Sequence, residues 1–415
     1  MSGRRPRERP AGGEDLTGVE WTVDVVAVAH GGHCIARHEG QVVFVRHALP
    51  GERVVARVTE GRVGDRFVRA DAVEVVEAST HRVEPPCRYA AERVCGGCDF
   101  QHASLPHQRE LKGAVVREQF SRLAGLEVDV EVRAVPGDVD GLRWRTRVEF
   151  AVDRSGRAGL RGHRSRRIVP VDDCLIATEA VVASGVLDTT WQDCTAVDVI
   201  DAAHPDEPVL VPLPHAAEGG GVVGERASDG SWVGEYVVAA RGFWQVHPGA
   251  ASTFLSRVVA LLEPTAGDRV IDLYAGAGLF TMRLGELVLP GGFVLGVEGD
   301  TRAVSNGRLN TEDLDDVEWR ANRVDRELAS LVAQGVTADL VVLDPPRTGA
   351  GRDVIGHLAD LGPRRVVYVA CDPAALARDV RSALDCGFRL AHLEAWDAFP
   401  MTHHVECIAV LEQSG

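Results

Sequence analysis

The second half of the chain constrains the fold most, because short apolar runs alternate there with segments of helical pattern. Six such runs are interpreted as strands: 269–273, 293–297, 339–343, 365–370, 388–394 and 405–411. Runs of this length and spacing predict strands joined by helices in a doubly wound, mostly parallel sheet. We therefore expect a Rossmann-like domain of α/β class in this part of the chain.

The turn after the first strand is suited to binding a nucleotide-like ligand. Gly276 and Gly278 would let the backbone approach a ligand at the carboxyl end of the strand. Glu298 ends the second strand, where a carboxylate accepts hydrogen bonds from both hydroxyls of a ribose. A dehydrogenase would share this logic, but Thr281 stands where the dinucleotide fingerprint has its third glycine. The Asp-Leu-Tyr-x-Gly-x-Gly pattern, which includes Tyr274, resembles the first motif of class I methyltransferases and implies S-adenosylmethionine as cofactor.

Two further strands end in polar residues. Asp344 follows one strand and begins Asp-Pro-Pro-Arg, and Cys371 follows the next and precedes Asp372-Pro373. Because ligands of open α/β sheets bind outside the carboxyl ends of strands, both side chains should face the crevice of the glycine turn. A free cysteine is often a small buried hydrophobe. A cysteine at a strand exit and a helix start instead favours a reactive thiol, whose pKa the helix N-terminus is expected to lower.

A thiolate at this position permits methylation of a pyrimidine at carbon 5. That carbon becomes nucleophilic after a thiolate adds at carbon 6, and a base must later remove the carbon-5 proton. Glu406, at the entry of the last strand, is the candidate base, and His404 is the competing one.

Three segments resemble motifs of the RNA 5-methyluridine methyltransferases. They are 368–379 around Cys371, 399–406 ending in Glu406, and 243–248 around Gln245. The resemblance implies that Cys371 is the nucleophile and that Glu406 is the base. It also implies a set of S-adenosylmethionine contacts: Gln245, Tyr274, Gly276, Gly278, Glu298, Asn322 and Asp344. The chain departs from the family pattern at Leu279, where many relatives carry a polar cofactor contact, and at Asp372, where asparagine is frequent.

Alternative chemistries fit the motifs less well. RNA cytosine-5 enzymes carry a second cysteine in the Asp344 motif, which has none here. Amino-group methyltransferases need no thiol and have an aromatic residue where this chain has Arg347. An RNA-binding protein with an inactive methyltransferase domain is the non-enzymatic alternative, and the presence of both Cys371 and Glu406 argues against it.

Four cysteines form a separate pattern. Cys87, Cys95 and Cys98 cluster, and Cys174 follows at a distance. Four thiolates suit either tetrahedral zinc or a [4Fe–4S] cluster. The Cys-Gly-Gly-Cys-x-x-Gln-His run from Cys95 resembles the iron–sulfur segment of the same family, which implies the [4Fe–4S] cluster, with structural zinc as the alternative.

RNA is the expected partner, either ribosomal or transfer RNA, and no obligate protein partner is inferred. The net charge of −16 argues against nucleic acid when taken alone, yet residues 143–167 carry nine arginines against two acids. Alternating runs with glycine turns predict a small barrel in the N-terminal module, which resembles a TRAM domain, an OB-like RNA-binding barrel. Trp144 and Phe150 are candidates for stacking on an extruded base.

The predicted organisation has four parts: a disordered tail (1–16), a TRAM-like barrel (17–78), a central β-rich domain with the four cysteines (79–250), and the methyltransferase domain (251–415). A helix at about 103–124 is expected to pack on the methyltransferase domain. The sequence shows neither a signal peptide nor an apolar run long enough to cross a bilayer, so a cytoplasmic protein without a membrane partner is expected.

Overall fold

The computed structural model describes residues 13–91, 93–214 and 220–414. These form two compact units. The first comprises the chain up to Glu84 together with His102–Ser104, and the second comprises Pro85–Gln101 and the chain from Leu105 onward. Most of the predicted tail, residues 1–12, lies outside the described residues. Leu16, at its end, is buried, and its backbone N–H donates to Gly61 O.

The first unit is a closed barrel with the strand order β1-β2-β3-β5-β4. Its strands are β1 (Glu20–Val28), β2 (Cys34–His38), β3 (Gln41–Arg46), β4 (Arg53–Glu60) and β5 (Phe67–Glu77). The OB-like barrel predicted from the sequence is confirmed. Strand β2 is not among the predicted strands, since the Gly31-Gly32 turn interrupts the alternation just before it. Glu52, buried at the start of β4, accepts hydrogen bonds from Leu49 N and from Arg82 and so fixes this end of the barrel.

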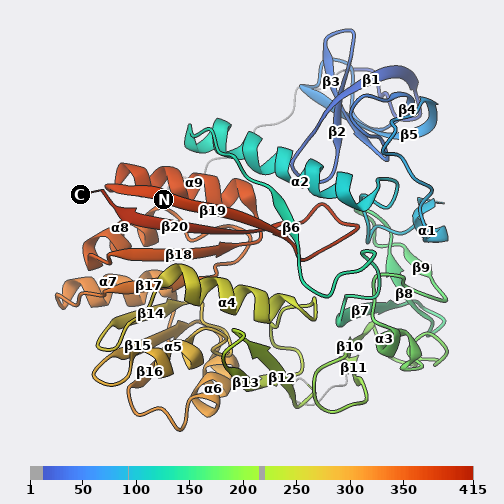
Figure 1. The fold of residues 1–415 in the computed structure, drawn as a ribbon. Helices are drawn as coiled ribbons and strands as arrows, with labels where there is room; N and C mark the ends of the chain where they lie inside the picture. Colours follow the sequence, from blue (N-terminus) through green and yellow to red (C-terminus); the bar gives the residue numbers. More distant parts are fainter. Residues whose placement is uncertain (1–12, 92, 215–219, 415) are drawn as a thin grey trace, which may run out of the picture. The chain divides into compact units, whose positions relative to one another are not determined.

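The second unit contains an eight-stranded sheet with the order β16-β15-β14-β17-β18-β20-β19-β6 (Figure 1). Its strands are β6 (Val132–Ala134), β14 (Arg269–Leu273), β15 (Phe293–Glu298), β16 (Val317–Ala321), β17 (Leu340–Leu343), β18 (Arg365–Ala370), β19 (Phe388–Asp397) and β20 (Glu406–Gln413). Strands β14 to β18 are parallel, and β20 runs antiparallel to β18. The Rossmann-like prediction is confirmed. Strand β6, contributed from before the central sheet, pairs with β19 at the edge and was not predicted.

Helices cover both faces of this sheet because successive strand residues point to opposite sides. On one face, Ile271 and Val341 pack with α7 (Val324–Ala333), α8 (Arg352–Leu361) and α9 (Pro373–Asp385). On the other, Val270 and Val342 pack with α4 (Ala250–Leu262) and α5 (Thr281–Val288). Helix α6 (Thr301–Asn310) packs on β16 and completes the layers.

A second, antiparallel sheet has the order β11-β10-β7-β8-β9. Its strands are β7 (Arg147–Val152), β8 (Ala158–Arg161), β9 (Ile168–Pro170), β10 (Ala196–Ile200) and β11 (Val209–Leu213). The short helices α1 (Arg88–Ala91) and α3 (Glu179–Ala183) flank it, and β12 (Val222–Ser228) and β13 (Val233–Ala239) form a separate hairpin. The β-rich central region is confirmed.

The helix predicted at about 103–124 is α2 (Leu105–Gln119), followed by the π-helical segment η1 (Phe120–Ala124). Phe120 and Val116 lie in the same core as α9 and the parallel sheet. Lys112, the only lysine of the sequence, is buried on α2 and donates to Asp397 and to Phe399 O. Helix α2 therefore contacts both the sheet and the loop that leads into β20.

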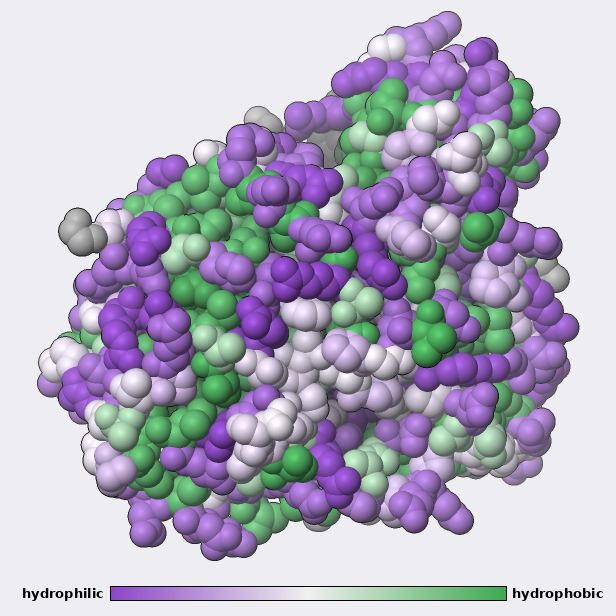
Figure 2. Space-filling model, viewed as in Figure 1, coloured by the Kyte–Doolittle hydropathy of each residue, from purple (hydrophilic) through white to green (hydrophobic). Residues whose placement is uncertain are grey.

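On the face drawn in Figure 2, hydrophilic side chains are interspersed with apolar ones. None of the helices in the described ranges is long and apolar enough to cross a membrane.

Candidate active site

Hydrogen bonds between neighbouring strands align the predicted cofactor contacts at one edge of the parallel sheet. Ala275 N donates to Val297 O, Asp344 N to Leu273 O and Asn322 N to Glu298 O. The residues at the carboxyl ends of β14, β15, β16 and β17 therefore stand in one row, as the common direction of the strands requires.

The turn after β14 adopts a backbone conformation that favours glycine. Gly276 and Gly278 have φ angles of +57° and +93°, in the left-handed region. Tyr274 has φ of +59°, which is uncommon for a residue with a side chain and often marks a functional turn. Gly276 N donates to Glu298 Oε2 at 3.0 Å, so the carboxylate at the end of β15 borders the turn directly.

Neighbouring side chains define the surroundings of Gln245 and Asn322. Gln245 is buried next to Trp244, whose ring packs on Tyr236, and Tyr236 donates to the carbonyl of Leu279 in the glycine turn. Asn322 donates to Glu327 Oε2 and accepts from Arg323 N, so its amide is oriented from both sides. The side chain of Leu279 is buried in the core, and its carbonyl supplies the contact to Tyr236.

The antiparallel pairing of β18 with β20 places Cys371 opposite Glu406. Ala370, the last residue of β18, pairs with Cys407. Because the two strands run antiparallel, Cys371, one position after Ala370, lies opposite Glu406, one position before Cys407. Cys371 is partly exposed, whereas Glu406 is buried, with only 5% of its surface accessible. The two residues predicted to react with the base are thus brought together by strand register.

The site is rich in carboxyl groups held away from water. Burial, opposed by hydrogen bonds from Thr281 and aided by Asp344 and Glu298, raises the pKa of Asp272 to about 7. Burial likewise raises the pKa of Asp344 to about 7. The pKa of Glu406 is raised well above its usual range by burial and by Asp344. In the described part of the chain, Asp272 Oδ1 and Glu406 Oε2 have no hydrogen-bond partner, as expected for groups awaiting a ligand.

The expectation that the helix terminus lowers the thiol pKa of Cys371 is wrong for the free protein. Burial raises that pKa to about 12, with Glu406 and Asp344 adding to the shift and Arg347 opposing it. Asp372 caps α9 by accepting a hydrogen bond from Ala375 N, so its carboxylate occupies the helix N-terminus that was expected to favour the thiolate.

Arg347 and His404 border the reactive pair. Arg347 lies 3.4 Å from His404, Nη2 to Nε2. Burial, together with the nearby His403 and Arg347, lowers the pKa of His404 to about 3. A histidine with so low a pKa is a poor proton acceptor near neutral pH, which favours Glu406 over His404 as the base. Arg347 was named in the sequence only as part of a motif, and its place beside both reacting groups follows from the fold.

The predicted stacking residues are not available to RNA. Phe150 is fully buried in the core of the antiparallel sheet, and Trp144 is 4% exposed. Trp144 instead stacks on His247 and meets the edge of Phe399. The stacking prediction is therefore wrong, because both rings lie inside the second unit rather than on its surface.

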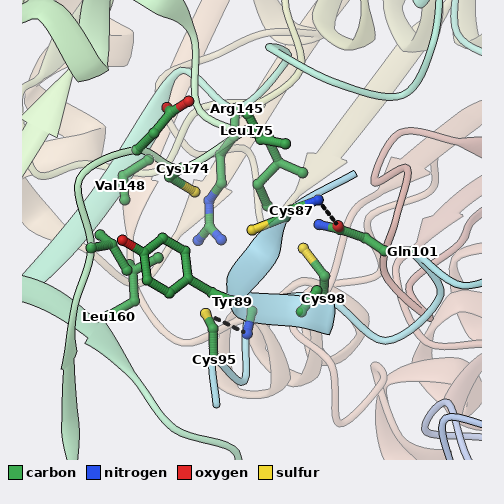
Figure 3. Close-up of a pocket in the computed structure, with 15 residues that line it drawn as sticks. Cys87, Tyr89, Cys95, Cys98, Gln101, Arg145, Val148, Leu160, Cys174 and Leu175 are labelled. Atoms are coloured by element: carbon green, nitrogen blue, oxygen red, sulfur yellow. Dashed lines mark hydrogen bonds between the residues drawn. The ribbon is translucent and has the colours of Figure 1, made fainter. Parts of the chain in front are cut away.

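The four cysteines of the separate pattern line one small cavity of about 50 Å³ in the second unit. Figure 3 shows the sulfur atoms of Cys87, Cys95, Cys98 and Cys174 around a common space into which the Arg145 guanidinium also points. Burial raises the pKa of the Cys95, Cys98 and Cys174 thiols. Buried thiols grouped around one space suit a cationic metal centre that binds them as thiolates.

The comparisons with known proteins agree with this geometry. Two family models match: the TRAM domain over residues 15–73 and tRNA (uracil-5-)-methyltransferase over residues 235–414. An RNA methyltransferase of Streptomyces coelicolor is 47% identical, with 96% of this chain and 93% of the relative covered. The 23S rRNA (uracil(1939)-C(5))-methyltransferase of Shewanella sp. is 30% identical over 92% of this chain and 93% of its own.

A solved structure has a similar fold. The Pyrococcus abyssi tRNA (uracil-54, C5)-methyltransferase, in complex with S-adenosyl-L-homocysteine, matches with a TM-score of 0.67 at 22% identity. The match covers 94% of this chain and 99% of that one. Fold and strand-end site together define a class I methyltransferase that uses S-adenosylmethionine and acts on RNA. Within that class, the chain belongs to the RNA (uracil-5-)-methyltransferase family.

Proposed function

We propose that this protein methylates carbon 5 of a uridine in RNA, with Cys371 as nucleophile and Glu406 as base. The observation that carries the proposal is the pairing of β18 with β20, which sets Cys371 against Glu406 at the edge that also holds the glycine turn. A thiol, a buried carboxyl and a ribose-binding acid at one sheet edge are the groups that this reaction requires.

The residues of the site act in sequence. The Cys371 thiolate adds to carbon 6 of the uracil ring, and the electron pair of the 5,6 double bond moves into an enolate. S-adenosylmethionine, when bound, supplies a methyl group on a positively charged sulfur. After carbon 5 has taken that methyl group, Glu406 removes the carbon-5 proton, the double bond re-forms and the bond between Cys371 and carbon 6 breaks. A carboxylate whose pKa is raised, as burial does for Glu406, is a stronger base for this proton transfer.

The carboxyl groups also fit the cofactor. Burial raises the pKa values of Asp272 and Asp344, and the neighbouring Asp344 and Glu298 add to the shift of Asp272. A ligand with a positive sulfonium and a ribose relieves that repulsion and offers hydroxyls to Glu298. The same positive charge favours the thiolate of Cys371, which the carboxyl groups disfavour in the free protein. We assign Gln245, Tyr274, Gly276, Gly278, Glu298, Asn322 and Asp344 to the cofactor.

We further propose that Cys87, Cys95, Cys98 and Cys174 hold a [4Fe–4S] cluster. All four belong to the described residues, and no three of their sulfur atoms lie within 4.8 Å of one another. Tetrahedral zinc with bonds of about 2.3 Å would place its sulfur ligands only about 3.8 Å apart. The wider spacing suits a larger centre, and the nearby Arg145 guanidinium compensates the negative charge of four thiolates.

The reaction is tested by mass spectrometry of nucleosides in a strain lacking the gene. Ribosomal and transfer RNA are analysed separately, beginning with ribosomal RNA because the Shewanella relative is named for it. We expect 5-methyluridine to be lost from one fraction and restored by the wild-type gene but not by Cys371→Ala. The matched control is Cys386→Ala, which alters an exposed cysteine at the other end of α9, the helix that begins just after Cys371. This variant should restore 5-methyluridine. Unchanged 5-methyluridine in both fractions would contradict the proposal.

The base is tested by trapping. Glu406→Gln keeps the size of the side chain but cannot accept the carbon-5 proton, so the enzyme should remain covalently bound to RNA. The expected readout is a complex that survives denaturing gel electrophoresis and carries one labelled methyl group. Glu412→Gln, on the same strand but paired with Arg365, should give free RNA product. Normal turnover by Glu406→Gln would assign the proton transfer to another group.

A further inference from the structure

The turn that follows Cys98 is bonded to the loop that leads into Glu406. Asp99 N and Phe100 N both donate to Met401 O, at 2.9 and 3.0 Å. The Asp99 carboxylate accepts from His403 N at 3.1 Å and from His403 Nδ1 at 2.6 Å. Four hydrogen bonds therefore join two segments that are separated by about 300 residues in the sequence.

The loop that receives these bonds adopts a conformation that its own sequence does not favour. Met401 has φ of +67°, a left-handed backbone angle that costs a residue with a side chain about 1–2 kcal/mol. Gln108 on α2 accepts from Met401 N, so the peptide groups on both sides of this residue are held by other segments. External contacts therefore fix the loop in place.

The same turn is tied to the cysteine site. Asp99 directly follows Cys98, so holding the Cys98 sulfur holds the backbone that carries the carboxylate. Gln101, at the end of the turn, accepts from Cys87 N at 3.1 Å, as Figure 3 shows. Cys98 and Cys87 are thereby linked to the turn that binds the loop from Phe399 to His404, which we call the catalytic loop.

We propose, on the basis of the function proposed above, that the four-cysteine centre positions the catalytic base through Asp99 and His403. Both are positioning residues, since each acts through the loop that leads into Glu406. When the centre is lost, the turn after Cys98 is released, the loop from Phe399 to His404 loosens, and Glu406, at the start of β20, is held less firmly opposite Cys371. Cofactor binding should survive, because the glycine turn and Glu298 are built on β14 and β15.

Hydrogen exchange tests this without reference to activity. Amide exchange is compared for the holoprotein, for the same protein after oxidative removal of iron, and for Asp99→Ala loaded with iron. Iron content and visible absorption establish the state of the centre in each sample. We expect peptides covering 399–404 to exchange about tenfold faster in the iron-free protein and in Asp99→Ala, while peptides covering 269–278 are unchanged.

Two further variants distinguish positioning from general damage. Asp99→Asn keeps an oxygen acceptor at the same place and should exchange like the wild type. Asp172→Ala removes a carboxylate that accepts from Tyr89 and Arg88 near the cysteine site but does not contact the catalytic loop. It should leave the exchange of 399–404 unchanged.

Kinetic measurements test whether Asp99 affects proton removal by Glu406. Asp99→Ala should lower kcat about tenfold or more, leave KM for S-adenosylmethionine within about twofold, and accumulate the covalent RNA complex, because proton removal becomes slow. Equal exchange of 399–404 in the holoprotein, the iron-free protein and Asp99→Ala would overturn the proposal. If the wild type formed neither product nor adduct, the proposed function would fail, whereas the exchange data would still decide whether the cysteine site orders the loop.

Discussion

Replacing Lys112 with methionine should destabilise the second unit strongly and in a pH-dependent way. Lys112 Nζ lies 2.5 Å from Asp397 Oδ1, and both side chains are 0% exposed. Methionine fills a similar volume but leaves the Asp397 carboxylate buried without its partner. Breaking a buried ion pair from one side costs about 3–5 kcal/mol.

Protonation of Asp397 sets an upper limit on the free-energy cost of leaving this carboxylate unpaired. The carboxylate can escape its unpaired state by taking up a proton, and an aspartic acid in an unfolded chain has a pKa of about 3.9. Protonation at pH 7 therefore costs about 4 kcal/mol, and at pH 5 only about 1.5 kcal/mol. Arg109, whose Nε lies 3.7 Å from Asp397 Oδ2, remains in Lys112→Met and reduces the loss somewhat. We expect a deficit of about 3 kcal/mol at pH 7 that falls to about 1 kcal/mol at pH 5.

Urea unfolding followed by circular dichroism at both pH values measures this deficit. The double variant Lys112→Met, Asp397→Asn removes both charges and should regain most of the stability, because the buried charge itself causes the loss. A deficit that is equal at pH 5 and pH 7, or a double variant as unstable as Lys112→Met, would refute the reasoning.

Four other outcomes are expected. Because the pKa of Cys371 is raised to about 12 in the free protein, its alkylation by iodoacetamide, followed by mass spectrometry, should rise about tenfold per pH unit from pH 7 to 10; a plateau by pH 8 would contradict this. Gly307→Ala places a methyl group 2.3 Å from the Trp319 ring and should cost about 1–3 kcal/mol. Gly356→Ala adds a methyl group to α8 that has no atom within 4 Å. This variant should instead be about 0.5–1 kcal/mol more stable than the wild type, and urea unfolding measures both glycine variants. Asp379→Asn weakens a carboxylate that holds the loop after β17 and should lower the melting midpoint by an amount equivalent to about 1–2 kcal/mol; an unchanged midpoint would exclude that role.

The sheet could be predicted because its strands are short apolar runs, and the row of residues at its carboxyl edge followed from their common direction. The β14 and β18 boundaries match the predicted runs, 269–273 and 365–370. The facing of Cys371 and Glu406 could not be derived in the same way. It depends on the antiparallel register of β18 and β20, which pairs Ala370 with Cys407 and leaves no periodic signal in either strand.

Contacts between distant segments account for the failed expectations. Phe150 and Trp144 belong to an arginine-rich stretch that suggested a surface, yet both rings point into the core beneath it. The thiol pKa of Cys371 was expected to follow the helix terminus, which is a local feature. The pKa instead follows burial, Glu406 and Asp344, which are features of the folded site.

The two halves of the site therefore depend on different parts of the chain. Apart from Gln245, the proposed cofactor half is built on neighbouring parallel strands between 269 and 344, and hydrogen bonds connect one strand end to the next. The catalytic loop is held by residues that precede these strands by more than 150 positions, among them Asp99 and Lys112. Perturbing the segment from 95 to 112 should consequently disable proton abstraction before cofactor binding, and a partly damaged enzyme should stall as a covalent complex rather than fail to bind its methyl donor.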